Sequence, residues 1–472
     1  MGKTLRDTNY LTLFFLLEKP SHPTTPQNSH WRKRKVLKMG STNPFNDNSL
    51  SIFKRIFHLI LYFLLSISLI CFYFDLFYLT HSPTQLIHST TIFTYNSSIS
   101  SSPPSNSSIG KDKTYDYKKS SCDYSNGDWV SEMRGPIYNV TTCGTIKESE
   151  NCITNGRPDL GYLYWRWKPN ECNLPRFEPN TFLKLIKNKH IAFVGDSLAR
   201  NQLESLLCML ATTSTPNLIY QNGKDNKFRK WHFPSHNANF SLYWSPFLVH
   251  GVERTNEGNY YNTMFLDIVN EIWARDIDQL DMIVISTGRW FLLPSIYYEN
   301  DLVIGSLNCP KHNHTQMDFY GPLRKALRTT LNSIIERKVA KGNKIDVIVK
   351  TFSPDHFEGD WDKDGTCSKT KPYRKDEKVL GGMETEIRKI EIEEVESAKV
   401  KVKKFEGIKF ELLDITKLAL LRPDGHPGPY MNYFPFANGV LKYVQSDCVH
   451  WCLPGPIDTW NEILLEIIKK WK

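Results

Sequence analysis

Residues 191–202 read Ile191-Ala-Phe-Val-Gly195-Asp196-Ser197-Leu198-Ala-Arg200-Asn201-Gln202, a short apolar run followed by Gly-Asp-Ser and a helical pattern. The run predicts a buried strand, and Gly195 allows a tight turn from that strand into a helix. Ser197 then falls in the first helical turn, where free N–H groups and the positive end of the helix dipole can stabilise an oxyanion. Asp or Ser before a helix is most often only an N-cap, so the tripeptide alone leaves both a cap and a nucleophile open.

Four β-branched or aromatic runs recur at wide spacing after about residue 186, and helical patterns lie between them. The strands are expected at Ile191–Val194, Met282–Ser286, Ile345–Phe352 and Phe410–Ile415, and the helices at Leu198–Leu210, Leu323–Val339 and Lys378–Val400. Strands that alternate with helices predict an α/β fold, doubly wound, with a mainly parallel sheet and helices on both faces. Such sheets bind ligands at the carboxyl ends of their strands, which is where Ser197 falls.

A second group of reactive side chains lies near the C-terminus, in Asp447-Cys448-Val449-His450-Trp451-Cys452-Leu453-Pro454-Gly455. Asp447 and His450, three residues apart, can converge within one turn, so the carboxylate can orient the imidazole. With Ser197 these residues supply the parts of a Ser-His-Asp relay, which is defined by geometry and not by chain order. The alternative is a zinc site made of Cys448, His450 and Cys452, but this spacing matches no usual zinc pair. We therefore expect no metal.

Gly195-Asp196-Ser197 with Asp447-x-x-His450 resembles the GDSL/SGNH esterases. The full set of stretches resembles the plant trichome-birefringence-like family of wall-polysaccharide O-acetyltransferases over residues 119–472. The matching stretches are Cys122-Asp-Tyr-Ser-Asn-Gly-Asp-Trp129, Asn155-Gly-Arg-Pro-Asp159, Trp165-Arg-Trp167, Leu174-Pro-Arg-Phe177, Val194–Gln202 and Asp447–Asn461. The resemblance implies a single-pass Golgi protein in which Ser197 is the nucleophile, His450 the base and Asp447 its orienting partner.

The resemblance is weaker at the oxyanion hole. Esterases of this fold complete the hole with a Gly and an Asn on later strands, whereas the strand-end stretch here is Ser286-Thr287-Gly288-Arg289-Trp290-Phe291, without an Asn. The backbone N–H of Ser197 and the side chain of Arg200 would then have to supply the remaining donors. The residues assigned to oxyanion or substrate contacts are Gly195, Asp196, Arg200 and Gly288.

The net charge of +9 is concentrated at the N-terminus. Residues 1–55 hold ten of the 59 basic residues and only three of the 50 acidic ones, so the rest of the chain is nearly neutral. A nucleic-acid partner, which needs a basic surface, is therefore not expected. Immediately downstream, Leu59–Phe74 is free of charge, and with its flanks it reaches the ~20 residues that span a bilayer.

Lys54 and Arg55 precede this apolar segment, and the next basic residue is Lys111. The positive-inside rule then places the N-terminus in the cytosol and the large C-terminal part in the lumen. A buried helix or a cleaved signal peptide is the alternative, but no small-residue cleavage site follows closely. Residues 1–38 receive no function, because Met39 would serve equally well as a start.

The expected organisation has five parts. These are a basic cytosolic tail (1–55), a transmembrane signal anchor (56–79), a Ser/Thr/Asn/Pro-rich luminal stem (80–118), a Cys/Trp-rich subdomain (119–185) and the α/β catalytic domain (186–472). All Asn-x-Ser/Thr sites follow the anchor, as a luminal glycoprotein requires: Asn96, Asn106, Asn139, Asn239 and Asn313. Together these features predict a single-pass type II protein of the Golgi membrane.

Nine of the ten cysteines also follow the anchor, which indicates an oxidising lumen. Four of them fall between residues 122 and 172 and predict a disulfide-linked, loop-rich subdomain. The resemblance implies the full pairing: Cys122–Cys172, Cys143–Cys208, Cys152–Cys452 and Cys367–Cys448, with Cys309 left free.

The leading hypothesis for the function is transfer of an acetyl group from a donor, through acetyl-Ser197, to a hydroxyl of a cell-wall hemicellulose. Beyond the acetyl donor no cofactor is expected. The stretches Ile285–Phe291 and Thr351–Gly359 resemble xyloglucan- and mannan-acting members more than xylan-acting ones, and the neutral body argues against acidic pectin. The alternatives are a polysaccharide acetyl-esterase with the same triad, and a non-catalytic wall-polysaccharide-binding protein that uses the aromatic residues of Cys122–Phe177.

Overall fold

The structure of the protein is a computed structural model. It describes residues 122–222, 227–255, 258–310, 312–359, 367–439 and 444–471, all within one compact unit. The predicted tail, membrane anchor and stem lie outside these residues. Within the described ranges, no helix combines the length and the apolar character needed to cross a bilayer.

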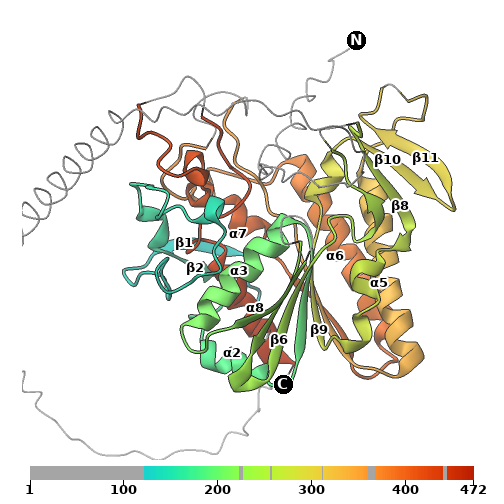
Figure 1. Ribbon diagram of the computed structural model, residues 1–472, viewed down its shortest axis with the longest axis horizontal. Coiled ribbons are helices and arrows are strands. Elements are labelled where there is room, and N and C mark those ends of the chain that lie inside the picture. Colours follow the sequence, from blue (N-terminus) through green and yellow to red (C-terminus); the bar gives the residue numbers. More distant parts are fainter. Residues whose placement is uncertain are drawn as a thin grey trace, which may run out of the picture. The chain divides into compact units, whose positions relative to one another are not determined.

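A seven-stranded sheet in the order β13-β12-β9-β3-β6-β5-β4 organises the fold (Figure 1). The five strands from β13 to β6 run parallel to one another. Strand β5 runs antiparallel to β6, and β4 runs antiparallel to β5. Four of them, lying side by side, correspond to the four predicted runs, so the parallel core of the prediction is confirmed. The strands are β3 (His190–Gly195), β4 (Asn217–Asn222), β5 (Phe228–Phe233), β6 (Ala238–Trp244), β9 (Met282–Ser286), β12 (Ile345–Lys350) and β13 (Ile408–Leu413).

Helices cover both faces of this sheet, as expected for a doubly wound fold. On one face lie α2 (Pro179–Leu185), α3 (Ser197–Ala211) and α8 (Asp458–Lys470), and on the other α5 (Tyr320–Lys341) and α6 (Gly382–Val402). Alternate residues of β3 point to the two faces of the sheet. Ile191 and Phe193 pack in the core on the side of α3, and Ala192 and Val194 pack in the core on the side of α5. A strand buried on both faces has to be apolar at every position, which made it recognisable in the sequence.

The remaining strands differ from the prediction in two ways. Strands β5 and β4 make one side of the main sheet antiparallel, and a second sheet is present. That sheet has the order β11-β10-β8-β7 and contains β7 (Val249–Val252), β8 (Asn262–Val269), β10 (Ser295–Glu299) and β11 (Leu302–Leu307). Every residue of β4 is exposed, and β5 and β8 are half-buried. Antiparallel strands that face water on one side carry alternating residues instead of the continuous apolar run used to find strands.

The N-terminal subdomain is loop-rich, as predicted, with one antiparallel pair, β1 (Gly127–Ser131) and β2 (Trp165–Pro169). Trp129 and Trp167 lie edge to face at 5.6 Å and are buried in the main core. The Trp129 indole N–H donates to the Leu418 carbonyl in α7 (Thr416–Leu420) at 2.9 Å. These aromatic residues therefore form a packed junction with the α/β domain, which argues against an open binding platform in this region.

Four disulfides link the pairs implied by the resemblance: Cys122–Cys172, Cys143–Cys208, Cys152–Cys452 and Cys367–Cys448. Cys309 is buried and free. The Cys152–Cys452 bridge joins residues 300 positions apart and ties the N-terminal subdomain to the segment after His450. In the chain-entropy model, closing so long a loop stabilises the folded state by upwards of ~4 kcal/mol.

Replacing Cys452 with Ser should therefore lower the melting temperature strongly and inactivate the protein, because the unfolded chain regains the freedom that the 300-residue loop removed. Thermal unfolding and non-reducing peptide mapping measure this. Cys309→Ser is the matched control and should leave both melting and activity close to wild type. A peptide linking Cys448 to Cys452, or any bridge to Cys309, would contradict the pairing.

Candidate active site

The turn between β3 and α3 begins at Gly195, whose φ is +151°. A β-carbon at this position would lie 1.8 Å from the carbonyl oxygen of Ser286 in the neighbouring strand β9. Only glycine fits, because the two strand ends approach too closely for a side chain. The predicted tight turn is therefore present, with a backbone constraint from β9 that the sequence did not reveal.

Asp196 is the N-cap of α3, and its Oδ1 accepts hydrogen bonds from the Leu198 N–H at 3.0 Å and the Ser286 hydroxyl at 3.3 Å. Burial raises the pKa of this carboxyl. Ser197 is the first residue of the 15-residue helix and is buried. Because Asp196 supplies the cap, the Ser197 side chain is not needed for capping, and the interpretation of Ser197 as only a cap loses its basis.

Asp447 and His450 converge as predicted. The His450 Nδ1–H donates to Asp447 Oδ2 at 2.7 Å, and Asp447 Oδ1 accepts from the backbone N–H groups of Val449 and His450 at 3.0 and 2.9 Å. Burial would raise the pKa of Asp447, but the His450 ring and these N–H groups outweigh it and hold that pKa below its usual range. The carboxylate thus stays ionised and fixes the tautomer that leaves His450 Nε2 as the basic nitrogen.

Asn201, one helical turn after Ser197, connects the two halves of the site. Its Oδ1 accepts from the Trp451 N–H at 2.8 Å and its Nδ2 donates to the Trp451 carbonyl at 3.1 Å. These bonds hold Trp451, the residue after His450, against the helix that begins with Ser197, whereas His450 Nε2 has no hydrogen-bond partner among the described residues. The sequence alone predicts no role for Asn201, because nothing in it names the partner 250 residues away.

Glu150 of the N-terminal subdomain bonds both to Asn201 and to the segment after His450. Its Oε2 accepts from Asn201 Nδ2 at 2.8 Å, and its backbone carbonyl accepts from the Leu453 N–H at 2.9 Å. The Arg200 guanidinium lies 3.6 Å from Glu150 Oε1, and both side chains are buried. Arg200 is therefore directed at a carboxylate, and its predicted contact to an oxyanion stays a prediction.

A chain of two buried histidines contacts His450 from the other side. His426 Nδ1 lies 2.7 Å from the His450 carbonyl, and His426 Nε2 lies 2.7 Å from His356 Nδ1. The chain ends at the Leu420 carbonyl, 2.7 Å from His356 Nε2. Burial lowers the pKa of both imidazoles. The sequence gives no specific signal for either histidine, because a lone His among Pro, Gly and Asp residues does not name its partner.

Gly288, the other residue assigned to the oxyanion region, follows β9 with φ +118° and begins the turn Arg289–Leu292. Arg289 is buried, pairs with Asp355, and stacks its guanidinium over the Phe352 ring at 5.2 Å. Since β9 adjoins β3, this turn lies at the same sheet end as Ser197. The zinc alternative is ruled out because Cys448 and Cys452 are both in disulfides.

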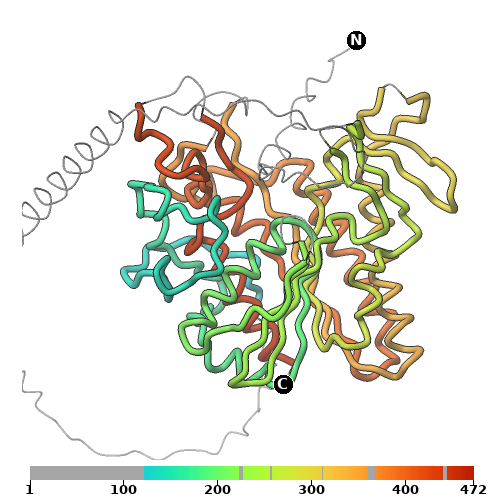
Figure 2. Tube along the Cα trace, in the orientation of Figure 1, coloured from blue at the N-terminus to red at the C-terminus, as the bar shows by residue number. Residues whose placement is uncertain are grey.

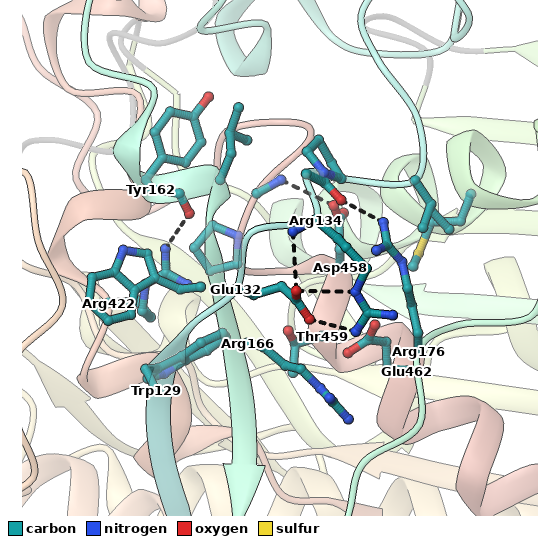
Figure 3. Close-up of a pocket in the computed structure, with 18 residues that line it drawn as sticks. Trp129, Glu132, Arg134, Tyr162, Arg166, Arg176, Arg422, Asp458, Thr459 and Glu462 are labelled. Atoms are coloured by element: carbon teal, nitrogen blue, oxygen red, sulfur yellow. Dashed lines mark hydrogen bonds and ion pairs between the residues drawn. The ribbon is translucent and has the colours of Figure 1, made fainter. Parts of the chain in front are cut away.

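A cavity of about 80 Å³ lies elsewhere, between the N-terminal subdomain and the start of α8 (Figure 3). In it Arg134 pairs with Glu132, and Asp458 accepts from the Ser205 hydroxyl at 2.6 Å. Burial raises the pKa of Asp458 to about 6 and that of Glu462 to about 7. Apart from the Arg134–Glu132 pair, its charged groups bond to neighbouring backbone and side-chain groups, such as Arg422 to the Tyr162 carbonyl and Glu462 to the Phe177 N–H, so we interpret the cavity as part of the junction between the subdomains.

Comparison with known proteins identifies two family models along the chain. PC-Esterase, a GDSL/SGNH-like acyl-esterase family found in Pmr5 and Cas1p, matches residues 174–467, and PMR5N, the PMR5 N-terminal domain, matches residues 120–173. Their junction falls at the start of the segment that leads into α2.

Individual relatives match over most of their length. Xyloglucan O-acetyltransferase 1 of Populus trichocarpa is 56% identical over 438 residues, which cover 92% of this chain and 98% of that protein. Xyloglucan O-acetyltransferase 2 of the same species is 61% identical over 354 residues, 75% of this chain and 83% of that protein. Protein trichome birefringence-like 24 of Arabidopsis thaliana is 40% identical over 359 residues, 75% and 83% of the two chains. The chain is therefore a member of the PC-Esterase family of GDSL/SGNH-like acyl-esterases and, within it, of the trichome birefringence-like proteins.

Proposed function

We propose that the protein is a xyloglucan O-acetyltransferase that works through an acetyl-Ser197 intermediate. The observation that carries the proposal is the Asp447–His450 pair, bonded through Asn201 and Trp451 to the helical turn that begins with Ser197. The similarity to xyloglucan O-acetyltransferases supports the acceptor. Mannan and xylan are the alternative acceptors, and water would be the acceptor of an esterase.

The reaction follows from the roles of the three side chains. His450 Nε2 removes the Ser197 proton as Oγ attacks the acetyl carbonyl of the donor, while Asp447 stabilises the imidazolium. The positive end of α3 stabilises the oxyanion, and the donor's leaving group departs with the proton held by His450. A sugar hydroxyl then gives its proton to His450 and attacks the acetyl-serine. The proton returns to Ser197 as the acetylated sugar leaves.

Replacing Ser197 with Ala should abolish acetyl transfer while leaving folding intact, because no other hydroxyl occupies the start of α3. The assay supplies an acetyl donor with separate xyloglucan, mannan and xylan oligomers, and mass spectrometry detects the products. Ser235→Ala, on an exposed turn, is the matched control and should keep full activity. Retention of more than a few per cent of wild-type activity by the Ser197 variant would remove this residue from the nucleophile role.

Replacing Asp447 with Asn should lower kcat by about 10³–10⁴-fold, because the amide no longer holds His450 in the required tautomer. The difference in folding stability between the Asp447→Asn variant and the wild type should also depend on pH. A carboxylate whose pKa is lowered by folding stabilises the protein above its unfolded pKa of about 4, and this contribution is lost as pH falls below that value. Melting curves should therefore differ by a constant amount from pH 5 to 8 and converge in stronger acid. A variant with more than a tenth of wild-type kcat would contradict the orienting role.

The proposal includes the predicted compartment, a Golgi membrane with the catalytic part in the lumen. Four disulfides support an oxidising environment, and the acceptor sites Asn139 and Asn313 are exposed, as N-glycosylation requires. Asn239 fits less well, since it is half-buried in β6 and its Oδ1 lies 2.9 Å from the His232 ring.

Protease treatment of sealed microsomes should leave residues beyond about 80 intact and remove the N-terminal tail, because the basic residues before the apolar segment keep the tail in the cytosol. Immunoblotting with tags at both ends measures this, and detergent-opened microsomes are the control in which both tags become accessible. A protected tail with a digested body would invert the topology.

A further inference from the structure

A cluster of aromatic side chains lies on the surface near Asp447–His450, a segment that we call the histidine turn. We call it the aromatic shelf, made of Tyr430, Tyr433, Phe434 and Phe436. Tyr433 is 67% exposed, Phe434 49% and Phe436 39%, and the Tyr430 and Phe436 rings meet edge to face at 5.9 Å. Exposed aromatic groups of this density mark surfaces that bind a ligand or partner. Among the described aromatic residues of Cys122–Phe177, in contrast, most are buried.

The shelf is held in place by the N-terminal subdomain, through the Asn155-Gly-Arg-Pro-Asp159 stretch. Phe434 has φ +42°, a conformation that is a genuine outlier for a bulky residue, and its N–H donates to the Asn155 carbonyl at 2.9 Å. Asn155 Nδ2 donates in turn to the Tyr430 carbonyl at 2.8 Å. The Phe434 ring lies against Gly156, where a β-carbon would come within 2.7 Å of it. A strained backbone fixed by several contacts points to a role for the exposed rings.

A cavity of about 360 Å³ adjoins the shelf, a volume within the range of small-ligand sites. Tyr430 and Phe436 line one side, and Ser446, the residue before Asp447, lines another. Gly428 and Asp447 exchange two backbone hydrogen bonds of 2.8 and 3.0 Å beneath it. In Figure 2 these orange-red loops run beside the teal N-terminal subdomain.

Among the residues that the structure describes, the charged side chains lining this cavity pair within the protein. Arg157 pairs with Asp159 at 3.2 Å, and Lys369 pairs with Glu358 at 3.5 Å. Arg157 also donates to the backbone carbonyls of Asp424 and His426, so its donors are largely used. The lining is mainly apolar, with the Ser368 and Thr370 side chains as further polar groups. Such a surface suits a neutral ligand that combines flat apolar faces with hydroxyl groups.

We propose that the aromatic shelf and the adjoining cavity bind the neutral sugar backbone of the polysaccharide acceptor, several units away from the one that is acetylated. The ring faces of the shelf contact the apolar faces of successive sugars, and the chain continues past Ser446 and Asp447 toward Ser197. This inference rests on the proposed function for the identity of the acceptor, but the binding surface is argued from the shelf itself.

The test is the double variant Tyr433→Ala/Phe436→Ala of the full chain, with three readouts. KM for xyloglucan polymer should rise about five- to tenfold, because two exposed ring contacts are lost, while kcat should stay within about twofold. Turnover of a small acetyl ester without polysaccharide should not change, since it bypasses the shelf. Tyr260→Ala, at a tyrosine 64% exposed, is the matched control and should leave all three values unchanged.

A binding measurement separates this inference from the proposed function. In a Ser197→Ala background, titration with xyloglucan oligosaccharides should show tight binding that the double variant weakens by a similar factor. Loss of xyloglucan binding in the double variant, together with a chain that transfers no acetyl group even with Ser197 intact, would support the shelf and reject the proposed function. Unchanged KM and unchanged binding in an active double variant would overturn the shelf and leave the proposed function standing. Preferential binding of acidic pectin fragments would also overturn it.

Discussion

The two hydrogen bonds between the Asn201 side chain and the backbone of Trp451 fix the geometry on which the proposed chemistry depends. They join the start of α3 to the histidine turn across 250 residues. Both partners are buried, so an unmade bond would leave polar groups without water or protein partners, at a cost of about 1–3 kcal/mol each. The sheet positions α3 and the disulfides position the histidine turn. Asn201 fixes the position of α3 relative to the histidine turn.

Buried charges gather at the same end of the sheet. Lys350, at the end of β12, is buried with its pKa lowered by burial, and Asp196 has its pKa raised by the same cause. Burial raises the pKa of Glu391 as well, although its side chain accepts from the Phe352 N–H at 2.8 Å. An interior that already excludes water strengthens the interaction of Asp447 with His450.

The sequence contained enough to predict β3, β9, β12 and β13 and the polar residues at their ends, but the buried strand β6 between β3 and β5 was missed. Gly195, Ser197, Asp447 and His450 could be named because a strand-to-helix turn and a three-residue Asp-His spacing are local patterns. Asn201, Glu150 and His426 could not be assigned, because their roles depend on partners that lie between 24 and about 300 residues away and that no local pattern names. The edge strand β4 and its neighbour β5 were missed for a different reason, since a strand that faces water lacks a continuous apolar run.

The link between Cys152 and Cys452 also bears on how the chain matures in the cell. Cys152 emerges from the ribosome 300 residues before its partner, while Cys122, Cys143 and Cys172 are already present as competing thiols. Domains at the N-terminus usually fold first during synthesis, but this subdomain cannot make all its covalent links until the last residues arrive. Its correct oxidation therefore depends on thiol–disulfide exchange that can undo early mispairing. A chain truncated just before Cys452 would leave Cys152 without its native partner and free to form a non-native bridge.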